Sequence, residues 1–181
     1  MNDNAHFDSK VIHAGQSYEE VTGAVMPPIF LSSTYVQQSP GIHTGFEYTR
    51  SHNPTRYALE RCIARLEGSS LTEDQDASYG GFAFSSGMAA VSTTLDLIDS
   101  GDHVIAMDDL YGGTNRLFNK VKKRSSGLQF TFADLTDINA LQTTITEKTK
   151  LIWIETPSNP MLKLVDLEGI VSIAKDRGIL L

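Results

Sequence analysis

Apolar and polar positions in the second half of the chain alternate between two patterns. Short apolar runs predict strands at residues 82–84, 103–107, 128–133, 150–154 and 179–181. Stretches with apolar residues at helical spacing predict helices at 88–98, 114–124, 137–147 and 166–176. Strands that alternate with helices through short links indicate an α/β fold, with a mostly parallel sheet and helices on both faces.

The first half of the chain has a different character. Residues 1–50 show little periodicity and contain several glycines and prolines, which predicts an extended N-terminal arm. Such an arm needs another surface to lie on, and a neighbouring subunit can supply it. Asn53 as N-cap and Pro54 at the first helical position start a helix that Gly68 ends. We therefore expect an arm over 1–50, then the first part of a larger domain over 51–181.

Charge and composition exclude several classes of function. The formal charge is −7, from 22 acidic residues against 15 Lys and Arg, which argues against a nucleic-acid partner. No apolar run approaches the roughly 20 residues that cross a bilayer, and the N-terminus has no apolar signal core. One cysteine, Cys62, cannot form an internal disulfide. These features predict a soluble cytoplasmic protein without a membrane partner.

Ligands of open parallel sheets bind beyond the carboxyl ends of the strands. The segments expected at that edge are 85–88, 108–114, Asp134 and 155–160. The segment Ser85-Ser86-Gly87-Met88 links a strand to a helix start, where unpaired N–H groups and the helix dipole favour a phosphate. The alternative is a turn that carries Ser and Gly for geometry alone.

Three further groups have side chains suited to an aromatic, phosphorylated ligand. Tyr111 lies beside two glycines and could stack on a flat ring; otherwise it is an ordinary loop tyrosine. In the arm, Tyr48 and Arg50 could bind a phosphate, unless Arg50 is a plain surface residue. Two prolines orient Glu155 and Asn159, so that Asn159 could bond a ring oxygen; the alternative is that the prolines only end a strand.

Other polar clusters suggest no further site. The five histidines show no metal-ligand spacing with Cys62 or with carboxylates, so we expect no metal. The basic run of Lys120, Lys122, Lys123 and Arg124 reads as a solvated helix end.

In order along the chain, the motifs at 48–56, 85–90, 109–114 and 155–160 resemble the Cys/Met-metabolism family of enzymes that depend on pyridoxal 5′-phosphate (PLP). This family includes cystathionine γ-lyase, cystathionine β-lyase, cystathionine γ-synthase and methionine γ-lyase. The resemblance extends from Phe7 to Leu181. It implies the type I aminotransferase-like fold of PLP-dependent transferases, with PLP as cofactor.

The resemblance also implies roles for individual residues. Gly87 and Met88, in the turn with Ser86, give backbone N–H groups to the phosphate. Tyr111 stacks on the pyridine ring and helps to move substrate protons. Asn159 contacts the ring oxygen, with Glu155 close behind it.

A homo-oligomer follows from the same resemblance. Tyr48 and Arg50 reach the phosphate of a neighbouring subunit's cofactor, which implies at least a dimer. A homotetramer built as a dimer of dimers is the expected assembly.

Two residues of the family pattern are missing from this chain. The Schiff-base lysine and the aspartate that bonds the ring nitrogen lie beyond Leu181 in the family. We therefore expect the N-terminal part of a longer enzyme, inactive alone. In its intact form it would act as a cystathionine γ-lyase, giving cysteine, 2-oxobutanoate and ammonia.

Several alternatives stay open. Cystathionine β-lyase and cystathionine γ-synthase activities are compatible with the same motifs. Gly113 stands where methionine γ-lyases tend to carry a cysteine, which disfavours that activity. From another class, the chain would be a non-catalytic module that lends Tyr48 and Arg50 to a complete enzyme. An unrelated nucleotide-binding domain is disfavoured because the Gly-x-Gly-x-x-Gly and Walker A spacings are absent.

Overall fold

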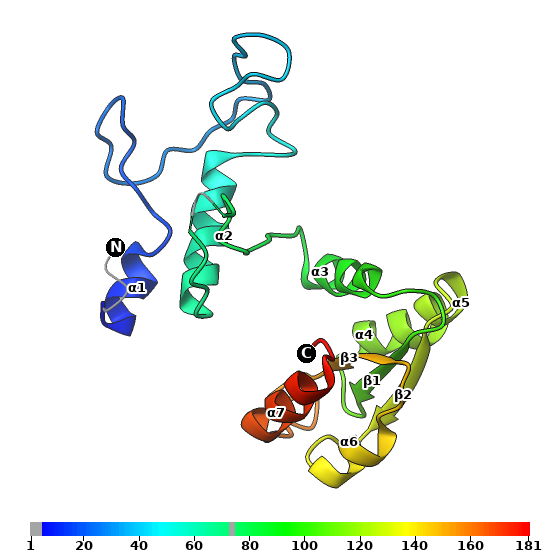
Figure 1. The fold of residues 1–181 in the computed structure, drawn as a ribbon. Helices are drawn as coiled ribbons and strands as arrows, with labels where there is room; N and C mark the ends of the chain where they lie inside the picture. Colours follow the sequence, from blue (N-terminus) through cyan, green and yellow to red (C-terminus); the bar gives the residue numbers. More distant parts are fainter. Residues whose placement is uncertain (1–4, 73–74) are drawn as a thin grey trace. The chain divides into compact units, whose positions relative to one another are not determined.

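The computed structural model describes residues 5–72 and 75–181, which fall into two compact units, residues 1–84 and 85–181 (Figure 1). Residues 1–4 of the predicted arm, and residues 73–74 of a polar loop at 69–79, lie outside the described residues.

The first unit contains two helices, α1 (Phe7–His13) and α2 (Pro54–Leu66). The short helix α1 lies inside the predicted arm and was not expected from the sequence. Between the two helices the chain runs irregularly, with isolated antiparallel bridges that pair Thr34 with Tyr48 and Ser39 with Ile42. Most of the predicted arm is therefore irregular, with turns, bends and isolated bridges.

Helix α2 begins and ends where its sequence predicts. The Asn53 side chain accepts hydrogen bonds from the backbone N–H groups of Thr55 and Arg56, and Pro54 occupies the first turn. Gly68 follows the helix with φ +85°, a conformation that glycine adopts without steric cost.

The prediction of a strand at 82–84 is wrong. These residues are extended but join no ladder in the described chain. The N–H of Ala83 instead donates to the Glu60 side chain on α2, at 2.9 Å. A side chain thus takes the hydrogen bond that a neighbouring strand would have supplied.

The second unit is built around a parallel sheet. Strand β1 (His103–Met107) lies between β2 (Gln129–Ala133) and β3 (Thr149–Trp153), in the order β2-β1-β3. Val104 pairs with Phe130 on one side and with Leu151 on the other. At the predicted last strand, only Leu180 pairs, in an isolated parallel bridge with Leu151.

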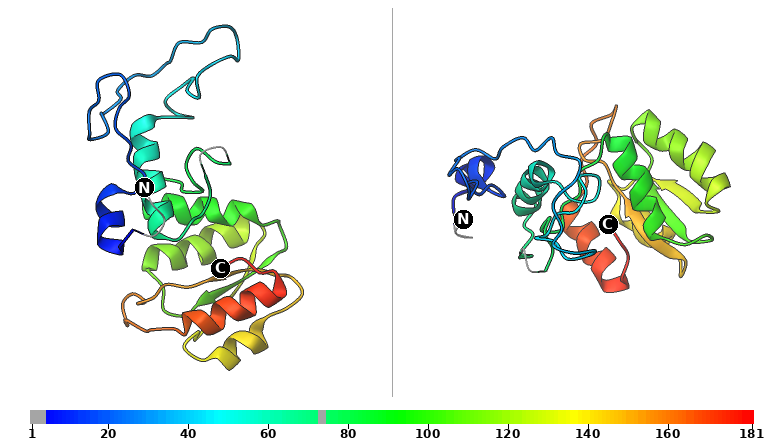
Figure 2. Two further views of the ribbon diagram at one scale, coloured as in Figure 1. Left: turned by 60° about the vertical axis from the view of Figure 1, so that its left-hand side comes forward. Right: turned by 90° about the horizontal axis from the view of Figure 1, so that it is seen from above.

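Helices cover both faces of this sheet, as Figures 1 and 2 show. The two views agree that α6 and α7 lie on one face, and that α3 and the helical run from 112 to 125 lie on the other. The helical elements are α3 (Gly87–Thr94), the 3₁₀ turn η1 (Leu95–Leu97), α4 (Gly112–Arg116), the π-helical η2 (Leu117–Lys122), α5 (Lys123–Ser125), α6 (Ile138–Thr144) and α7 (Leu167–Arg177). The helix predicted at 114–124 is thus one run with a π-helical middle.

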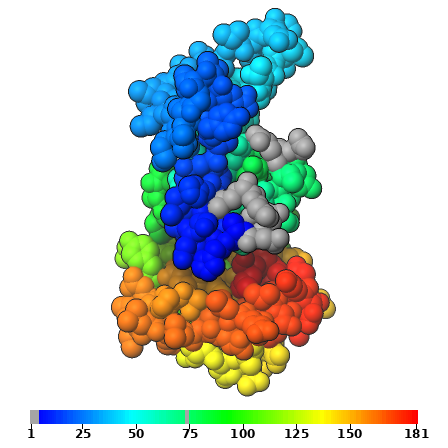
Figure 3. Space-filling model, turned by 90° about the vertical axis from the view of Figure 1, so that its left-hand side faces the viewer, coloured from blue at the N-terminus to red at the C-terminus, as the bar shows by residue number. Residues whose placement is uncertain are grey.

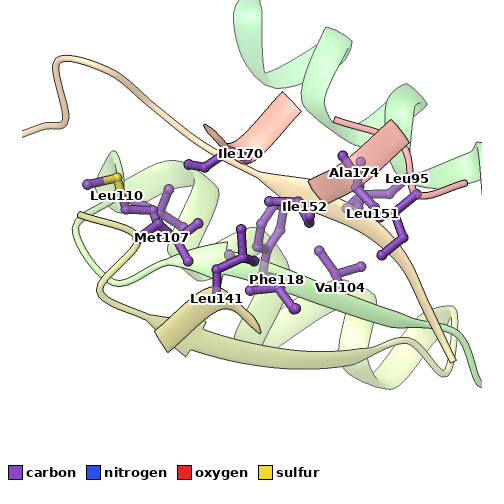
Figure 4. Packing of buried hydrophobic residues seen from close by; sticks show 14 of the residues in the cluster. Leu95, Val104, Met107, Leu110, Phe118, Leu141, Leu151, Ile152, Ile170 and Ala174 are labelled. Carbon is purple, nitrogen blue, oxygen red and sulfur yellow. The ribbon is translucent and has the colours of Figure 1, made fainter. Parts of the chain in front are cut away.

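The core of the second unit surrounds β1, all five residues of which are buried (Figure 4). Phe118, from η2, stacks on Phe130 at 4.8 Å between ring centroids and meets the edge of Trp153 at 5.9 Å. Burial of such apolar surface stabilises the fold by roughly 25 cal/mol per Å². This packing holds the sheet on which the candidate site is built.

The basic run near the end of this helical segment is only partly solvated. Lys122 is buried, and its ammonium group lies 2.6 Å from a carboxylate oxygen of Asp96. The prediction of a wholly solvated helix end is therefore wrong at this residue, because an acidic partner from η1 compensates its burial. Within the described residues, none of the helices combines the length and apolar character that a membrane crossing requires.

Candidate functional site

The turn at 85–88 leads into α3 as the sequence predicts. Ser86 is the N-cap in an extended conformation (φ −161°, ψ 158°), and its hydroxyl oxygen accepts the N–H of Ala89 at 3.2 Å. The Ser86 carbonyl accepts the N–H groups of Ala89 and Ala90. In the described part of the chain, the N–H groups of Gly87 and Met88 meet no acceptor. Two unpaired donors at a helix N-terminus form a natural site for an anion.

Tyr111 lies against the same turn. A Cβ atom built on Gly113 would stand 2.4 Å from Cε1 of Tyr111 and 3.0 Å from the Met88 sulfur. Gly113 therefore leaves the space that the tyrosine ring and the Met88 side chain share. Tyr111 is 49% exposed, so the ring offers an open aromatic surface beside the free amides.

Glu155 fixes the backbone of Tyr111. One carboxylate oxygen accepts the N–H of Tyr111 at 2.8 Å, and the other accepts the hydroxyl of buried Thr114 at 3.1 Å. Tyr111 is the N-cap of α4 and gives no side-chain cap of its own, so Glu155 supplies the negative charge at this helix start. The structure thus shows Glu155 orienting Tyr111; a direct contact of Glu155 with a cofactor stays a prediction.

The loop that carries Asn159 is anchored by its neighbour Ser158, which is 1% exposed. Its hydroxyl donates to the carboxylate of Asp109 and accepts the N–H of Lys163 at 2.8 Å. The same oxygen of Asp109 accepts the N–H of Met161 at 2.8 Å. Asn159 itself is exposed, on a segment that Figure 3 shows in orange beside α7, in red. The peptide bonds before Pro157 and Pro160 are both cis.

Lys163 ties this loop to the carboxyl ends of two strands. Its ammonium group lies 2.9 Å from a carboxylate oxygen of Asp108, just after β1, and 3.0 Å from one of Asp134, just after β2. The hydrogen bonds to Asp108 and then to Asp134 raise the pKa of Lys163. Hydrogen bonds from Thr136 and then from Lys163 lower the pKa of Asp134.

Sequence reasoning missed this set of anchoring residues. Asp108 and Lys163 lie outside the motifs that resemble the family, and Asp109 and Thr114, at the ends of the 109–114 motif, had no role assigned to them. The partners of these four residues lie 29 to 55 residues away. Strand order alone hints at them, because it brings the loops after β1, β2 and β3 to one edge. The structure shows that hydrogen bonds link those loops.

The other two candidates belong to the first unit. Tyr48 and Arg50 are both exposed, and the Arg50 guanidinium lies 5.1 Å from the centroid of the Tyr48 ring. Arg50 supplies a cation and Tyr48 a hydroxyl donor, side by side on the surface of that unit. Their relation to a cofactor in a neighbouring subunit stays a prediction.

The residues present fit a flat ring that carries a phosphate. The second unit offers two unpaired amides for the phosphate, an open aromatic face for the ring, and the exposed amide side chain of Asn159. Among the described residues there is no group of three or more His, Cys, Asp or Glu placed to hold a metal ion.

Comparison with known proteins adds evidence of a different kind. The family model described as "Cys/Met metabolism PLP-dependent enzyme" matches residues 8–181. The chain is 54% identical over 179 residues to cystathionine β-lyase of Coxiella burnetii, covering 99% of this chain and 44% of the relative. It is 47% identical over 174 residues to human cystathionine γ-lyase, covering 96% of this chain and 40% of the relative.

Solved structures agree with this comparison. The structure of metB from Corynebacterium glutamicum superposes with a TM-score of 0.89 at 36% identity, covering 99% of this chain and 45% of that one. Cystathionine γ-lyase from Lactobacillus plantarum, complexed with L-serine, gives a TM-score of 0.88 at 41% identity, over 97% of this chain and 43% of that one. The expected fold class is confirmed, and the chain spans less than half the length of each of these four proteins. The chain therefore belongs to the Cys/Met-metabolism family of PLP-dependent enzymes.

Proposed function

We propose that the intact form of the protein acts in transsulfuration as a PLP-dependent carbon–sulfur lyase with cystathionine as substrate, and that this chain alone, without a Schiff-base lysine, is inactive. The observation that carries the proposal is the pair of unpaired amides at Gly87 and Met88, next to the exposed ring of Tyr111. Membership of the family supports PLP as the ligand of this site.

In this proposal each residue has a distinct task. The amides of Gly87 and Met88 bind the phosphate, with Ser86 shaping the turn. Tyr111 stacks on the ring, and Asn159 donates its amide N–H to the phenolic oxygen. When bound, PLP supplies an electron sink for the charge that forms at the substrate Cα as its proton leaves. In this proposal the Tyr111 hydroxyl holds or passes on a proton at that position.

A second copy of the chain completes the site. Tyr48 and Arg50 of one subunit bind the phosphate in its neighbour, so the active assembly is at least a dimer and is expected to be a dimer of dimers. Support comes from the exposure of both side chains and from apolar residues of the arm that lie open to solvent. Val21 is 90% exposed, Leu31 91% and Val36 89%. Isolated apolar side chains at such levels gain stability when another surface covers them.

γ-Elimination is the first choice of reaction, giving cysteine, 2-oxobutanoate and ammonia. β-Elimination is the second candidate, favoured by the 54% identity to a cystathionine β-lyase. The single cysteine, Cys62, is compatible with a reducing compartment such as the cytoplasm.

Product analysis tests the reaction. The purified intact form is supplied with PLP and L-cystathionine, and the oxo acid is identified. Release of 2-oxobutanoate supports γ-elimination, whereas pyruvate supports β-elimination. Formation of cystathionine from cysteine and an activated homoserine ester would instead support a γ-synthase. Cofactor binding by the intact form without any of these reactions would support the non-catalytic module.

A further inference from the structure

Arg56, on the first turn of α2, holds the backbone of the segment that follows Tyr48. Its Nη1 donates to the carbonyl oxygens of Thr49 and Arg50, both at 3.3 Å. Its Nη2 donates to the carbonyl oxygen of Ser51 at 2.5 Å. Three successive carbonyl groups therefore converge on one guanidinium, next to the two exposed side chains of the candidate phosphate site.

Glu60 fixes the guanidinium from the other side. The Nε of Arg56 lies 3.2 Å from a Glu60 carboxylate oxygen, and Glu60 is 5% exposed. The same oxygen accepts the N–H of Ala83 at 2.9 Å. Gly81 packs so closely on the Glu60 backbone that a Cβ there would lie 2.3 Å from the Glu60 carbonyl oxygen. A carboxylate that is buried and held in this way leaves its arginine partner little freedom.

The cap of α2 acts on the same segment. Asn53 accepts the N–H of Arg56 at 3.3 Å and donates to the Thr49 hydroxyl at 3.3 Å. Thr49 also pairs with the preceding chain, since its N–H donates to the Ser33 carbonyl at 3.0 Å. The backbone at 49–51 is thus held from both sides, while the side chains of Tyr48 and Arg50 remain exposed.

We propose that Arg56 is a positioning residue for phosphate binding, which sets the backbone from which Tyr48 and Arg50 project. The inference rests on the proposed function, because it assumes that Arg50 binds the phosphate of PLP. We do not assign that role to Arg56 itself, because each of its three nitrogens already has a partner within the chain. Its planar fork is essential, since a lysine ammonium at this place cannot reach three carbonyls and a carboxylate together.

The test compares the affinities of the protein for PLP and for pyridoxal, which lacks the phosphate. Quenching of the fluorescence of Trp153, the single tryptophan of the chain, reports binding of either compound. The variants are Arg56→Lys, Arg50→Ala and the double variant. Arg65→Lys is the matched control, because Arg65 lies on the same helix but bonds the Ser69 carbonyl.

We expect Arg50→Ala and Arg56→Lys each to weaken PLP binding by about tenfold while pyridoxal binding stays unchanged. The double variant should bind PLP no more weakly than Arg50→Ala alone, because Arg56 acts only through that segment. A general loss of stability would instead lower the affinities for both PLP and pyridoxal. In the double variant, the losses of the two single variants would add.

The outcomes separate the inference from the proposed function. If wild-type protein prefers PLP and Arg50→Ala reduces that preference, but Arg56→Lys behaves like Arg65→Lys, the inference alone is overturned. Additive losses of PLP affinity in the double variant overturn it as well. If wild-type protein binds PLP no more tightly than pyridoxal, the proposed phosphate site fails and the inference falls with it.

Discussion

Gly113 sets the position of the Tyr111 ring. The space that a Cβ would need at residue 113 is taken by Tyr111 Cε1, 2.4 Å away, and by the Met88 sulfur, 3.0 Å away. Any side chain at this position must displace the ring, because a rigid aromatic atom cannot move independently of its neighbours. The disfavoured methionine γ-lyase pattern, with cysteine here, would therefore require a different tyrosine position.

The substitution Gly113→Ala tests this dependence. We expect PLP affinity to fall by a few fold, because a stacked aromatic contact contributes about 0.5–1.5 kcal/mol beyond its buried area. Trp153 fluorescence measures the affinity. Gly112→Ala is the control, since a Cβ there would meet only Nη1 of Arg116 at 3.4 Å. Equal affinities for the two variants would show that the ring does not stack on PLP.

Lys163 bonds Asp108 and Asp134 in the loops after β1 and β2, yet it is poorly suited to attack an aldehyde. Its two carboxylate partners raise the pKa of its ammonium group, so the neutral amine is scarcer than at an ordinary lysine. Its stabilising contacts persist below the ordinary pKa of lysine and are lost only as pH rises through the raised value. Its role is to anchor the 158–163 loop.

Borohydride reduction in the presence of PLP, followed by peptide mass mapping, checks this assignment. Lys163 should carry less pyridoxyl label than exposed Lys120, which has no ion-pair partner in the described chain. Preferential labelling of Lys163 would instead identify it as the reactive amine. It would also contradict the expectation that the Schiff-base lysine is missing from this chain.

His103 joins the three strands of the sheet. Its ring nitrogens bond the hydroxyls of Thr149 on β3 and Thr131 on β2, each at 2.9 Å, and its side chain is buried. Burial lowers the pKa of His103, so the folded state favours the neutral ring. Below about pH 6.5 the unfolded chain therefore takes up a proton that the folded chain resists. The free energy of unfolding decreases as the pH is lowered through this range.

Urea unfolding measures this effect. Between about pH 7.5 and about pH 5.5 the midpoint of wild-type protein should fall more than that of His103→Gln, which cannot titrate there. The other four histidines are common to both proteins, so the difference belongs to His103. The same pH dependence in both proteins would contradict a lowered pKa.

Local signals in the sequence predicted most of the elements. The cap of α2 by Asn53, the cap of α7 by Asp166 and the left-handed Gly178 after α7 all occur where the residue types favour them. Strand β1 matches its predicted bounds because a continuous apolar run suits a strand buried on both faces.

Features that depend on distant partners were not predictable in this way. The extended segment at 82–84 resembles a strand in composition, but its hydrogen bond goes to Glu60 on α2. Burial of Lys122 depends on Asp96, 26 residues earlier. The hydrogen bonds of Asp109 and Lys163 that shape the candidate site depend on loops that only the folded sheet brings together.

The proposed sharing of sites between subunits makes a distinct prediction for the assembled protein. In the proposed dimer, Arg50→Ala would damage the phosphate site of the neighbour, whereas Gly87→Pro would damage the subunit's own. In a hybrid dimer of these two variants, one site receives both intact groups and the other receives neither. After mixing and subunit exchange, half of the dimers are hybrid, and each hybrid dimer has one intact site of its two. PLP binding should therefore be restored at about a quarter of all sites.

The count of PLP bound per chain, at a concentration where neither variant binds alone, measures this recovery. Two Arg50→Ala preparations mixed together serve as the control. No recovery in the hybrid mixture would mean that Arg50 and Gly87 serve the site of the same subunit, or that Arg50 binds no phosphate at all.

Phosphate binding at the start of α3 can be tested at a single atom, the amide nitrogen of Gly87. Proline suits the first position of a helix, and the extended conformation of Ser86 suits the residue before a proline. Gly87→Pro therefore removes one N–H donor and keeps the helix. Gly87→Ala keeps the donor, and its Cβ would enter open space.

The measurement is the ratio of PLP to pyridoxal affinity in these two variants. We predict that Gly87→Pro lowers the PLP affinity by about tenfold without changing that of pyridoxal, and that Gly87→Ala behaves like wild-type protein. Equal PLP affinities for the proline and alanine variants would contradict it.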